Sequence, residues 1–345
     1  MPAQFPTDNH LGASHIPSTN ASPDGHVTVL LHEAVAALNP KSGGVYIDGT
    51  FGGGGHTGLL LRHEPPVREV IAIDADIEAA PRAAALAVDP GSQGRLRFVH
   101  RNFRELNSVL RDSGVDRVDG VLLDLGLSSF QLNEGERGFS FRYDAPLDMR
   151  YEQGVGITAA QLVNHESEEE MARLLWTFGE ERQSRRIASA IVRSRERSPI
   201  LTTGELASVV ERTVGRRGNS PIHPATRTFQ ALRIQVNNEL DALTEVLPAA
   251  VESLGPGGRL VVIAFHSLED RIVKRFLEAA TRNCVCPPEQ PVCTCDTVPR
   301  LRRVGKPVRP GLSEISDNPR SRSAIMRVAE RLDSNGQVAN RGSSQ

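Results

Sequence analysis

Short apolar runs alternate with amphipathic stretches over the first third of the chain. The apolar runs are continuously hydrophobic, as expected of parallel strands buried on both faces. Alternating strands and helices indicate a parallel sheet that is covered by helices on both sides. Strands are predicted at 45–48, 70–74, 96–100 and 119–124, and helices at 28–38, 57–63, 77–87 and 103–112.

The pattern changes between residues 134 and 236, where no strand is predicted. Near Gly255 the alternation resumes, because a Pro-Gly-Gly turn is followed by another apolar run. The simplest interpretation is one α/β sheet interrupted by an all-helical insertion. Helices are predicted at 166–177, 180–195 and 203–213 in the insertion, followed by a strand at 259–265, a helix at 268–281 and a last strand at 323–331.

These patterns divide the chain into a discontinuous α/β domain, 26–134 and 237–331, and a helical insertion, 135–236. Residues 1–25 are rich in Pro, Ser, Asn and His, lack the pattern of a secretory signal and are expected to be a disordered tail, as are 332–345. The sequence contains no run of 18 apolar residues, so no membrane span is predicted. Four cysteines without a secretory signal favour a reducing, cytoplasmic location. The sequence predicts no oligomeric state.

Positive charge is concentrated in two segments, although the net charge of the chain is only −2. Residues 182–233 hold 11 arginines and three acids, and residues 300–331 hold nine lysines and arginines and three acids. Such patches suit contact with a phosphate backbone. The alternative is a pair of solvated helical faces. Two patches beside a nucleotide site favour a nucleic-acid partner.

A glycine-rich segment joins the first two predicted strands and reads Asp48-Gly-Thr-Phe-Gly-Gly-Gly-Gly-His-Thr-Gly58. It contains the G-x-G-x-x-G pattern of nucleotide-binding loops. Asp74 ends the second strand 20 residues after Gly54, near the spacing of an acid that binds ribose hydroxyls. The alternative is a flexible loop between strands. Asp48 favours S-adenosylmethionine over a dinucleotide, because a carboxylate attracts the methionine ammonium and repels a pyrophosphate.

A further acid, Asp124, ends the fourth predicted strand and begins the motif Asp124-Leu-Gly-Leu-Ser-Ser129. Ligands of open α/β sheets bind outside the carboxyl ends of the strands. Asp124 is therefore expected at the mouth of the same cleft as the glycine loop and Asp74. The alternative is a turn acid bonded to its own backbone.

With these motifs the chain resembles the RsmH (MraW) family of S-adenosylmethionine-dependent methyltransferases, which methylate N4 of a cytidine in 16S ribosomal RNA of the small subunit. The resemblance implies a Rossmann-like class I methyltransferase sheet, with the insertion as the substrate-recognition domain. The matching motifs lie between residues 26 and 331, and include 26–35, 46–56, 124–129, 136–141, 146–150, 179–182, 223–233 and 265–271.

The resemblance also implies roles for particular residues. Gly54, Gly55 and His56 would line the methionine end of S-adenosylmethionine, and Asp74 would hold its ribose. Phe103 would place its aromatic ring on the adenine. Asp124 and Gln131 would supply the polar groups that complete the site. Without the resemblance, Phe103 is equally a core residue and Gln131 a surface residue. Asp124 is the candidate catalytic residue, as an acceptor for the target amine, a cofactor ligand, or both.

Three further residues are candidates for substrate contact. Arg150 and Arg227 are suited to bidentate contacts with RNA phosphates, and the alternative for each is an internal ion pair. His266 follows a predicted strand and is either a general base or a residue that ties the strand to the next helix. In this prediction Ser267 is the N-cap of that helix, with Asp270 at the capping-box position.

The four cysteines form the pattern C-x-C-x6-C-x-C, at Cys284, Cys286, Cys293 and Cys295. Four thiolates suit tetrahedral zinc, but the spacing differs from common C-x2-C pairs. The alternative is a set of reduced cysteines in a proline-rich loop. No metal is assigned to the catalytic site, since methyl transfer requires none.

Overall fold

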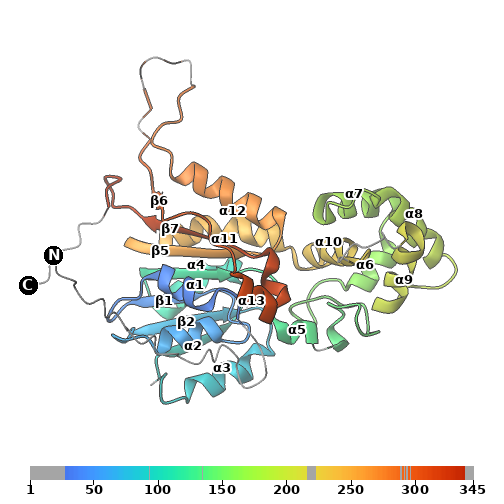
Figure 1. Ribbon diagram of the computed structural model, residues 1–345, viewed down its shortest axis with the longest axis horizontal. Coiled ribbons are helices and arrows are strands. Elements are labelled where there is room, and N and C mark those ends of the chain that lie inside the picture. The colour runs from blue at the N-terminus through green and yellow to red at the C-terminus, as the bar shows by residue number, and fades with distance from the viewer. Residues whose placement is uncertain are drawn as a thin grey trace, which may run out of the picture.

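The computed structural model describes residues 28–338 except 93, 134, 216–222, 288, 289, 291, 293 and 296. The predicted tail at 1–25, residues 339–345 and Cys293 lie outside the described residues. Figure 1 shows an α/β part with a group of helices beside it. No helix in the described ranges has the length and hydrophobicity to cross a membrane.

The described residues form one seven-stranded sheet with the order β3-β2-β1-β4-β5-β7-β6. Strands β1 to β5 pair in parallel, whereas β7 runs antiparallel to both β5 and β6. This topology confirms the predicted Rossmann-like class I fold. The strands are β1 (Val45–Asp48), β2 (Glu69–Asp74), β3 (Leu96–His100), β4 (Val118–Asp124), β5 (Leu254–Ala264), β6 (Leu301–Arg303) and β7 (Ile325–Arg331).

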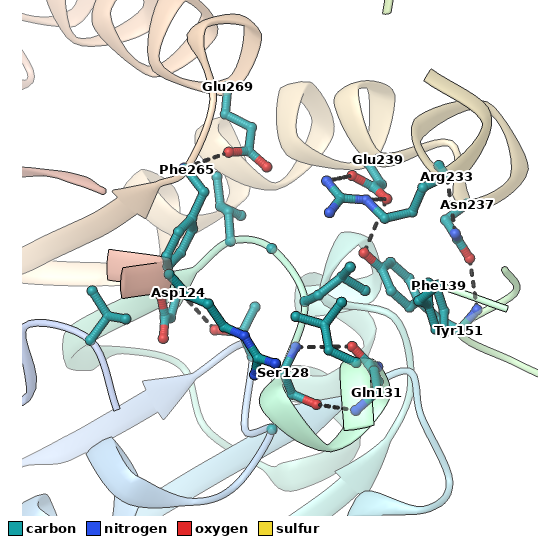
Figure 2. A pocket seen from close by; sticks show the side chains of 18 of the residues that line it. Asp124, Ser128, Gln131, Phe139, Tyr151, Arg233, Asn237, Glu239, Phe265 and Glu269 are labelled. Atoms are coloured by element: carbon teal, nitrogen blue, oxygen red, sulfur yellow. Dashed lines mark hydrogen bonds and ion pairs between the residues drawn. The ribbon is translucent and has the colours of Figure 1, made fainter. Parts of the chain in front are cut away.

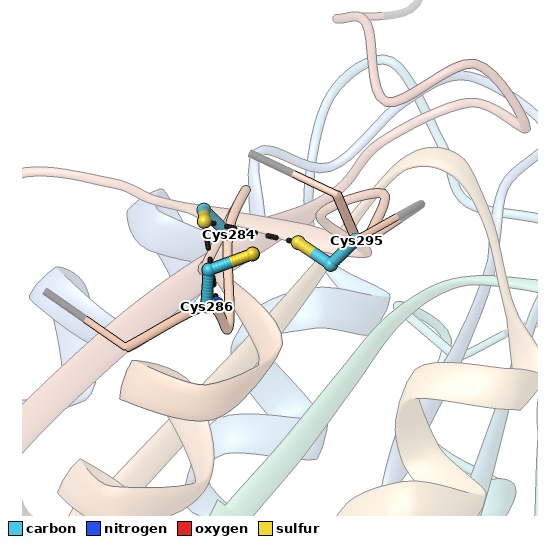
Figure 3. A group of neighbouring side chains, drawn as sticks. All are labelled: Cys284, Cys286 and Cys295. Atoms are coloured by element: carbon cyan, nitrogen blue, oxygen red, sulfur yellow. Dashed lines mark hydrogen bonds between the residues drawn. The ribbon is translucent and has the colours of Figure 1, made fainter. Parts of the chain in front are cut away.

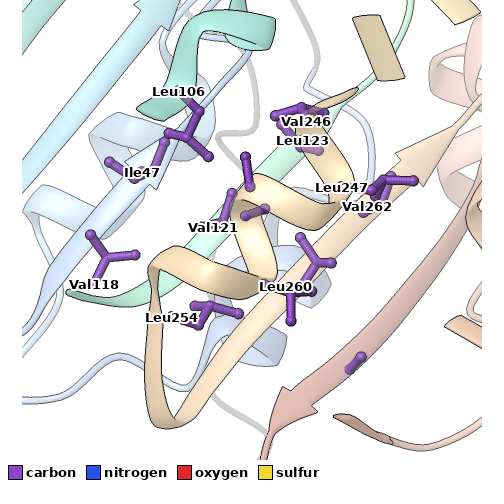
Figure 4. Packing of buried hydrophobic residues seen from close by; sticks show 14 of the residues in the cluster. Ile47, Leu106, Val118, Val121, Leu123, Val246, Leu247, Leu254, Leu260 and Val262 are labelled. Carbon is purple, nitrogen blue, oxygen red and sulfur yellow. The ribbon is translucent and has the colours of Figure 1, made fainter. Parts of the chain in front are cut away.

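Alternate side chains of the strands enter two different apolar layers. Ile47 and Leu123 belong to the cluster that packs against α4, α11 and α12, which is drawn in Figure 4. Tyr46 and Leu122, one position earlier on the same strands, belong to the cluster under α1 and α2. The covering helices are α1 (Leu31–Leu38), α2 (Gly55–Leu61), α3 (Ala79–Ala87), α4 (Leu106–Ser113), α11 (Glu239–Ser253) and α12 (Ser267–Ala280).

The helices between β4 and α11 have their own buried cluster, in which Met171, Ile187 and Leu232 are fully buried. Capping boxes explain where two of these helices begin, since Thr158 pairs with Gln161 and Thr202 with Glu205. The helices are α5 (Ser129–Asn133), α6 (Ala159–His165), α7 (Glu168–Gly179), α8 (Ser184–Arg195), α9 (Thr203–Val214) and α10 (Thr226–Asn237).

The structure differs from the sequence prediction in several elements. Helices α5, α6, α10 and α11, the short α13 (Leu312–Asp317) and strand β6 are additional. Helix α11 contains Pro248, a residue that normally ends a helix. Order also continues past the predicted boundary at 331, because Leu332 is buried and its N–H donates to the carbonyl of Arg300.

Candidate active site

A cavity of about 480 Å³ lies at the carboxyl ends of β1, β2 and β4. The strand order reverses between β1 and β4, which is where open α/β sheets bind their ligands. The glycine loop and Asp74 line the cavity, and Figure 2 shows Asp124 on one side of it with Arg233 and Glu239 on the other. The sheet and the helical part therefore share a single cavity.

The glycine loop curls tightly around Phe51. Gly54 has a φ of +76°, and a Cβ at this position would lie 2.7 Å from the Phe51 ring. A Cβ on Gly55 would lie 2.0 Å from Thr28 Oγ1, so neither position accepts a larger residue without a shift. Gly52, Gly53, Gly55 and His56 line the cavity, whereas Gly54, also predicted to contact the cofactor, is buried and does not line it.

Asp74 fixes the glycine loop from the end of β2. Its Oδ2 accepts the Gly52 N–H at 2.7 Å, and its Oδ1 accepts the Asp76 N–H at 2.8 Å. Burial raises the pKa of Asp74 to about 6, although both hydrogen bonds act in the opposite direction. Each carboxylate oxygen can accept more than one hydrogen bond, so Asp74 can still bind hydroxyls from the cavity.

Asp48 does not line the cavity, contrary to the role that the sequence suggested. It is buried, and its oxygens accept from Thr57 Oγ1 at 2.7 Å and from the Thr50 N–H at 3.2 Å. Burial raises the pKa of Asp48 to about 6. Asp48 therefore joins the end of β1 to the start of α2 and shapes the loop rather than meeting an ammonium directly.

Asp124 and His56 lie together behind the glycine loop. His56 Nδ1 is 3.7 Å from Asp124 Oδ2, and the backbone N–H of Asp124 donates to Thr50 Oγ1 at 2.7 Å. Among the described residues, Asp124 Oδ1 has no hydrogen-bond partner. Burial, followed by the nearby charges of Asp48 and Glu269, raises the pKa of Asp124 well above its usual range. Asp124 therefore lines the cavity and keeps one buried acceptor oxygen that no described residue uses.

Phe103 and Gln131 also line the cavity, as the sequence predicted. Phe103 begins a short 3-10 helix (Phe103–Glu105) after β3, which Asn102 caps by accepting the Arg104 N–H. Gln131 is buried, accepts the Ser128 N–H at 3.1 Å and donates to Asp76 Oδ2 at 3.0 Å. Hence Gln131 is held by the protein, whereas the Phe103 ring offers an apolar face.

His266 is the N-cap of α12, which corrects the predicted cap at Ser267. The His266 ring accepts the Glu269 N–H, and the Glu269 carboxylate accepts the His266 N–H at 3.2 Å. Glu269 therefore takes the capping-box position that the sequence assigned to Asp270, which instead pairs with Arg327 at 2.7 Å. This geometry supports the structural alternative for His266, although the residue also lines the cavity.

Neither candidate arginine lines the cavity. Arg150 forms two short contacts with the carboxylate of Asp148, at 2.7 and 2.8 Å, which is the internal ion pair of the alternative prediction. Arg227 is exposed and donates to the carbonyl of Glu180 at 3.1 Å. Glu180 in turn contacts Arg271 at 2.9 Å, so Arg227 lies at the junction of the helical part with α12.

A polar group that the sequence did not predict lies at the far end of the cavity. Arg233 pairs with Glu239 at 2.8 and 2.9 Å, and Tyr151 donates its hydroxyl to Glu239 at 3.0 Å. Asn237 fixes this arrangement by accepting the Tyr151 N–H at 2.7 Å (Figure 2). Tyr151 lies 86 positions before Asn237 and 88 before Glu239, so local sequence patterns did not reveal this group.

The sheet and the glycine loop, with an acid at the end of β2, an aromatic ring after β3 and Asp124 after β4, define a class I S-adenosylmethionine-dependent methyltransferase. The model of the MraW methylase family matches residues 24–332. The chain belongs to this family, which confirms the resemblance seen in the motifs.

Three relatives carry the name ribosomal RNA small subunit methyltransferase H. The protein from Thermomicrobium roseum is 53% identical over 312 residues, covering 90% of this chain and 95% of that protein. The protein from Geobacter sp. strain M21 is 50% identical, with 89% and 98% covered. The protein from Nitrosomonas eutropha is 47% identical, with 91% and 99% covered.

Proposed function

We propose that this protein transfers a methyl group from S-adenosylmethionine to N4 of a cytidine in 16S ribosomal RNA of the small subunit. One observation carries the proposal beyond family membership. The Asp124 carboxylate, with an oxygen that lacks a partner in the described chain, lies in the same cavity as the glycine loop. A hydrogen-bond acceptor beside a nucleoside-binding site suits methyl transfer to an exocyclic amine, because the amine can donate a hydrogen bond to it.

The cofactor-binding assignments of the sequence stand as part of this proposal. Gly54, Gly55 and His56 are assigned to the methionine end, and Asp74 to the ribose. The ring of Phe103 would pack on the adenine, as aromatic side chains do on flat apolar surfaces. Gln131 supports the site by fixing the turn after β4. When bound, S-adenosylmethionine supplies an electrophilic methyl group next to a positively charged sulfur.

Asp124 is proposed to activate the target amine by accepting its hydrogen bond. The lone pair of this amine is delocalised into the cytosine ring, so a hydrogen bond that favours a pyramidal nitrogen assists attack. The methyl group would pass to N4 with the C–S electrons left on sulfur, and Asp124 would take the surplus N4 proton and release it to solvent. Positioning and electrostatics supply most of the acceleration.

The far end of the cavity is the proposed site of the target base. Phe139 stacks on Tyr151 with ring centroids 5.5 Å apart, and the pair lines the cavity together with Phe265. Burial and the neighbouring Glu239 keep the pKa of the Tyr151 hydroxyl well above its usual range, so it remains a donor. Apolar faces with a few fixed polar groups suit a base that has been turned out of an RNA stack.

The helical part, 135–236, is proposed as the substrate-recognition domain, inserted into the methyltransferase domain formed by 26–134 and 237–331. Its separate core supports this division. Between α8 and α9 lies a second cavity of about 470 Å³ that contains Arg186, Arg193, Arg197 and Arg212. No carboxylate lines it, and none of these arginines forms an ion pair within the described chain. Their charge is available to RNA phosphates.

Three alternative functions make different predictions. An NAD-dependent oxidoreductase on a similar sheet would bind NAD rather than S-adenosylmethionine. An RNA-binding or assembly protein without catalysis would bind RNA but transfer no methyl group. A methyltransferase for small molecules would not need the arginines between α8 and α9.

The direct test uses the purified chain, labelled S-adenosylmethionine and small ribosomal subunits that lack the modification. We expect label in 16S ribosomal RNA, and mass spectrometry of digested RNA should locate it as N4-methylcytidine. Binding titrations with S-adenosylmethionine and NAD run in parallel. Cofactor binding without RNA labelling would reject the substrate, and absence of cofactor binding would reject the whole proposal. A cytoplasmic location is part of this proposal, because the proposed substrate is ribosomal.

A further inference from the structure

Three cysteines come together in the segment that joins α12 to β6, away from the cavity at the sheet. The Sγ atoms of Cys284, Cys286 and Cys295 all lie within 4.8 Å of one another (Figure 3). Those of Cys284 and Cys295 are 3.7 Å apart. A disulfide requires about 2.05 Å, so this pair is not bonded covalently.

The sulfur separations match the requirements of a tetrahedral metal. With Zn–S bonds of about 2.3 Å, two thiolates on one zinc ion lie about 3.8 Å apart. The Cys284–Cys295 distance of 3.7 Å agrees with this value. All three potential ligands are sulfur, which selects a soft metal such as zinc rather than magnesium or calcium.

The backbone around the thiols favours negative charge on sulfur. The Val285 N–H donates to Cys295 Sγ and the Cys286 N–H donates to Cys284 Sγ, each at 3.4 Å. Donors of this kind orient metal-bound thiolates and stabilise their charge. They also link the two halves of the segment, because Val285 and Cys295 are ten positions apart.

Among the described residues of this segment, several apolar side chains are exposed rather than packed. The side chains of Val285 and Val292 are 61% and 68% exposed, and Val298 is 51% exposed. Small units without an apolar core commonly depend on a disulfide or a metal ion. The gathered thiols supply such a link.

We propose that Cys284, Cys286 and Cys295 bind a structural zinc ion as thiolates and thereby order the segment between α12 and β6. The proposal rests on the three described thiols, and nothing in it depends on methyl transfer. The site would determine how the strand β6, with Arg302 and Arg303, follows α12.

The test begins with metal analysis of the full chain, expressed with zinc and purified without chelator under reducing conditions. About one zinc per chain is expected. After exchange, cobalt should give the intense visible bands and the thiolate charge-transfer absorption of a tetrahedral sulfur site. The double variant Cys284→Ser, Cys295→Ser should lose both signals, whereas Val292→Ser, an exposed change in the same segment, should keep them.

A second measurement covers the possibility that the double variant is damaged elsewhere. Chelator treatment of the wild type should speed proteolytic cleavage between α12 and β6, and added zinc should reverse this effect. Binding of S-adenosylmethionine, measured by calorimetry, reports whether the sheet is intact. The proposal would be overturned if the wild type contained no zinc and showed no cobalt absorption bands after exchange. Zinc retained by the double variant would also overturn it and would direct attention to Glu239, His266 and Glu269, whose ligand atoms lie together in the main cavity.

Discussion

His56 Nδ1 lies 3.7 Å from Asp124 Oδ2, and both side chains lie behind the glycine loop that borders the cavity. The two residues come from the start of α2 and the end of β4, elements that are far apart in the sequence and adjacent in the fold. An imidazole at this distance can orient the carboxylate of Asp124, whose buried Oδ1 has no hydrogen-bond partner among the described residues.

Replacing Asp124 with Asn should nearly abolish methyl transfer while preserving the shape of the site. The Asn side chain retains one acceptor oxygen but loses the negative charge that strengthens the hydrogen bond from the attacking amine. We expect the single-turnover rate to fall by about 10²-fold or more. Calorimetry with S-adenosylmethionine and a thermal melt serve as controls for binding and folding. A folded variant that methylates within a few-fold of the wild type would remove Asp124 from catalysis.

The pH dependence of kcat/KM should reflect the raised pKa of Asp124. Burial and the charges of Asp48 and Glu269 keep this carboxyl protonated to a higher pH than an exposed aspartate. Because the ionised form is the acceptor, activity should rise with pH through that pKa. The profile should be measured between about pH 5 and 8, since kcat/KM reports groups of the free enzyme. A flat profile on the acid side would contradict the assignment.

Asp48→Asn should change how stability depends on pH. The pKa of Asp48 is about 6 in the folded protein, so the native state keeps a proton that the unfolded chain releases at lower pH. Stability from this group is therefore present at low pH and is lost as pH rises from about 4 to 6, by about 3 kcal/mol.

The variant carries no titrating group at this position and so does not lose this stability as pH rises. The difference in unfolding free energy, variant minus wild type, should therefore increase with pH. Urea denaturation of both proteins at about pH 5 and pH 8 measures the difference. An unchanged difference between the two pH values would show that Asp48 does not titrate as proposed. Methylation by the variant, measured at both pH values, shows whether the loop keeps its shape.

Arg137→Met should destabilise the protein strongly. Arg137 and Asp76 are both buried, and the guanidinium contacts both oxygens of Asp76 at 3.1 and 3.2 Å. Removing one partner leaves a buried charge, at a cost of about 3–5 kcal/mol. The double variant with Asp76→Asn should recover part of this loss. A single variant as stable as the wild type would mean that the pair is not desolvated in solution.

Arg193→Gln combined with Arg197→Gln should weaken binding to ribosomal RNA and reduce its salt dependence. Each lost phosphate contact should lower the slope of log affinity against log salt by about one. Arg173→Gln is a matched control, because Arg173 belongs to the same helical part but is paired with Glu170 on α7. Equal effects of the control and the double variant would indicate a general charge effect.

The sequence predicted β1, β2 and β4 well, because their side chains are largely buried on both faces and hydrophobicity alone marks them; the edge strand β3 was also predicted, although it is only partly buried. Asp74 and Asp124 were predicted at the cavity for a related reason, since each is the last residue of such a buried strand, whereas Phe103 was predicted from the family resemblance. Asp48 was misassigned, since a pattern cannot show that its carboxylate turns toward Thr57 rather than into the cavity. The cap at His266 was missed because Ser267 is the more common capping residue.

The group formed by Tyr151, Arg233 and Glu239 was not predictable in this way. Its members lie on separate elements and meet only when the helical part packs against the start of α11. Helix α11 was itself missed, since Pro248 interrupts its pattern and the surrounding packing compensates for the lost hydrogen bond. Such sites depend on tertiary contacts, which periodicity does not encode.

The helices 159–237 are inserted between β4 and β5, two neighbouring strands that pair along most of their length. The chain leaves the sheet immediately after Asp124 and returns through the helix that begins at Glu239. Lengthening or exchanging this insertion would leave the pairing of the two strands in register. During evolution such a protein can therefore acquire a new target while the geometry of methyl donation stays the same.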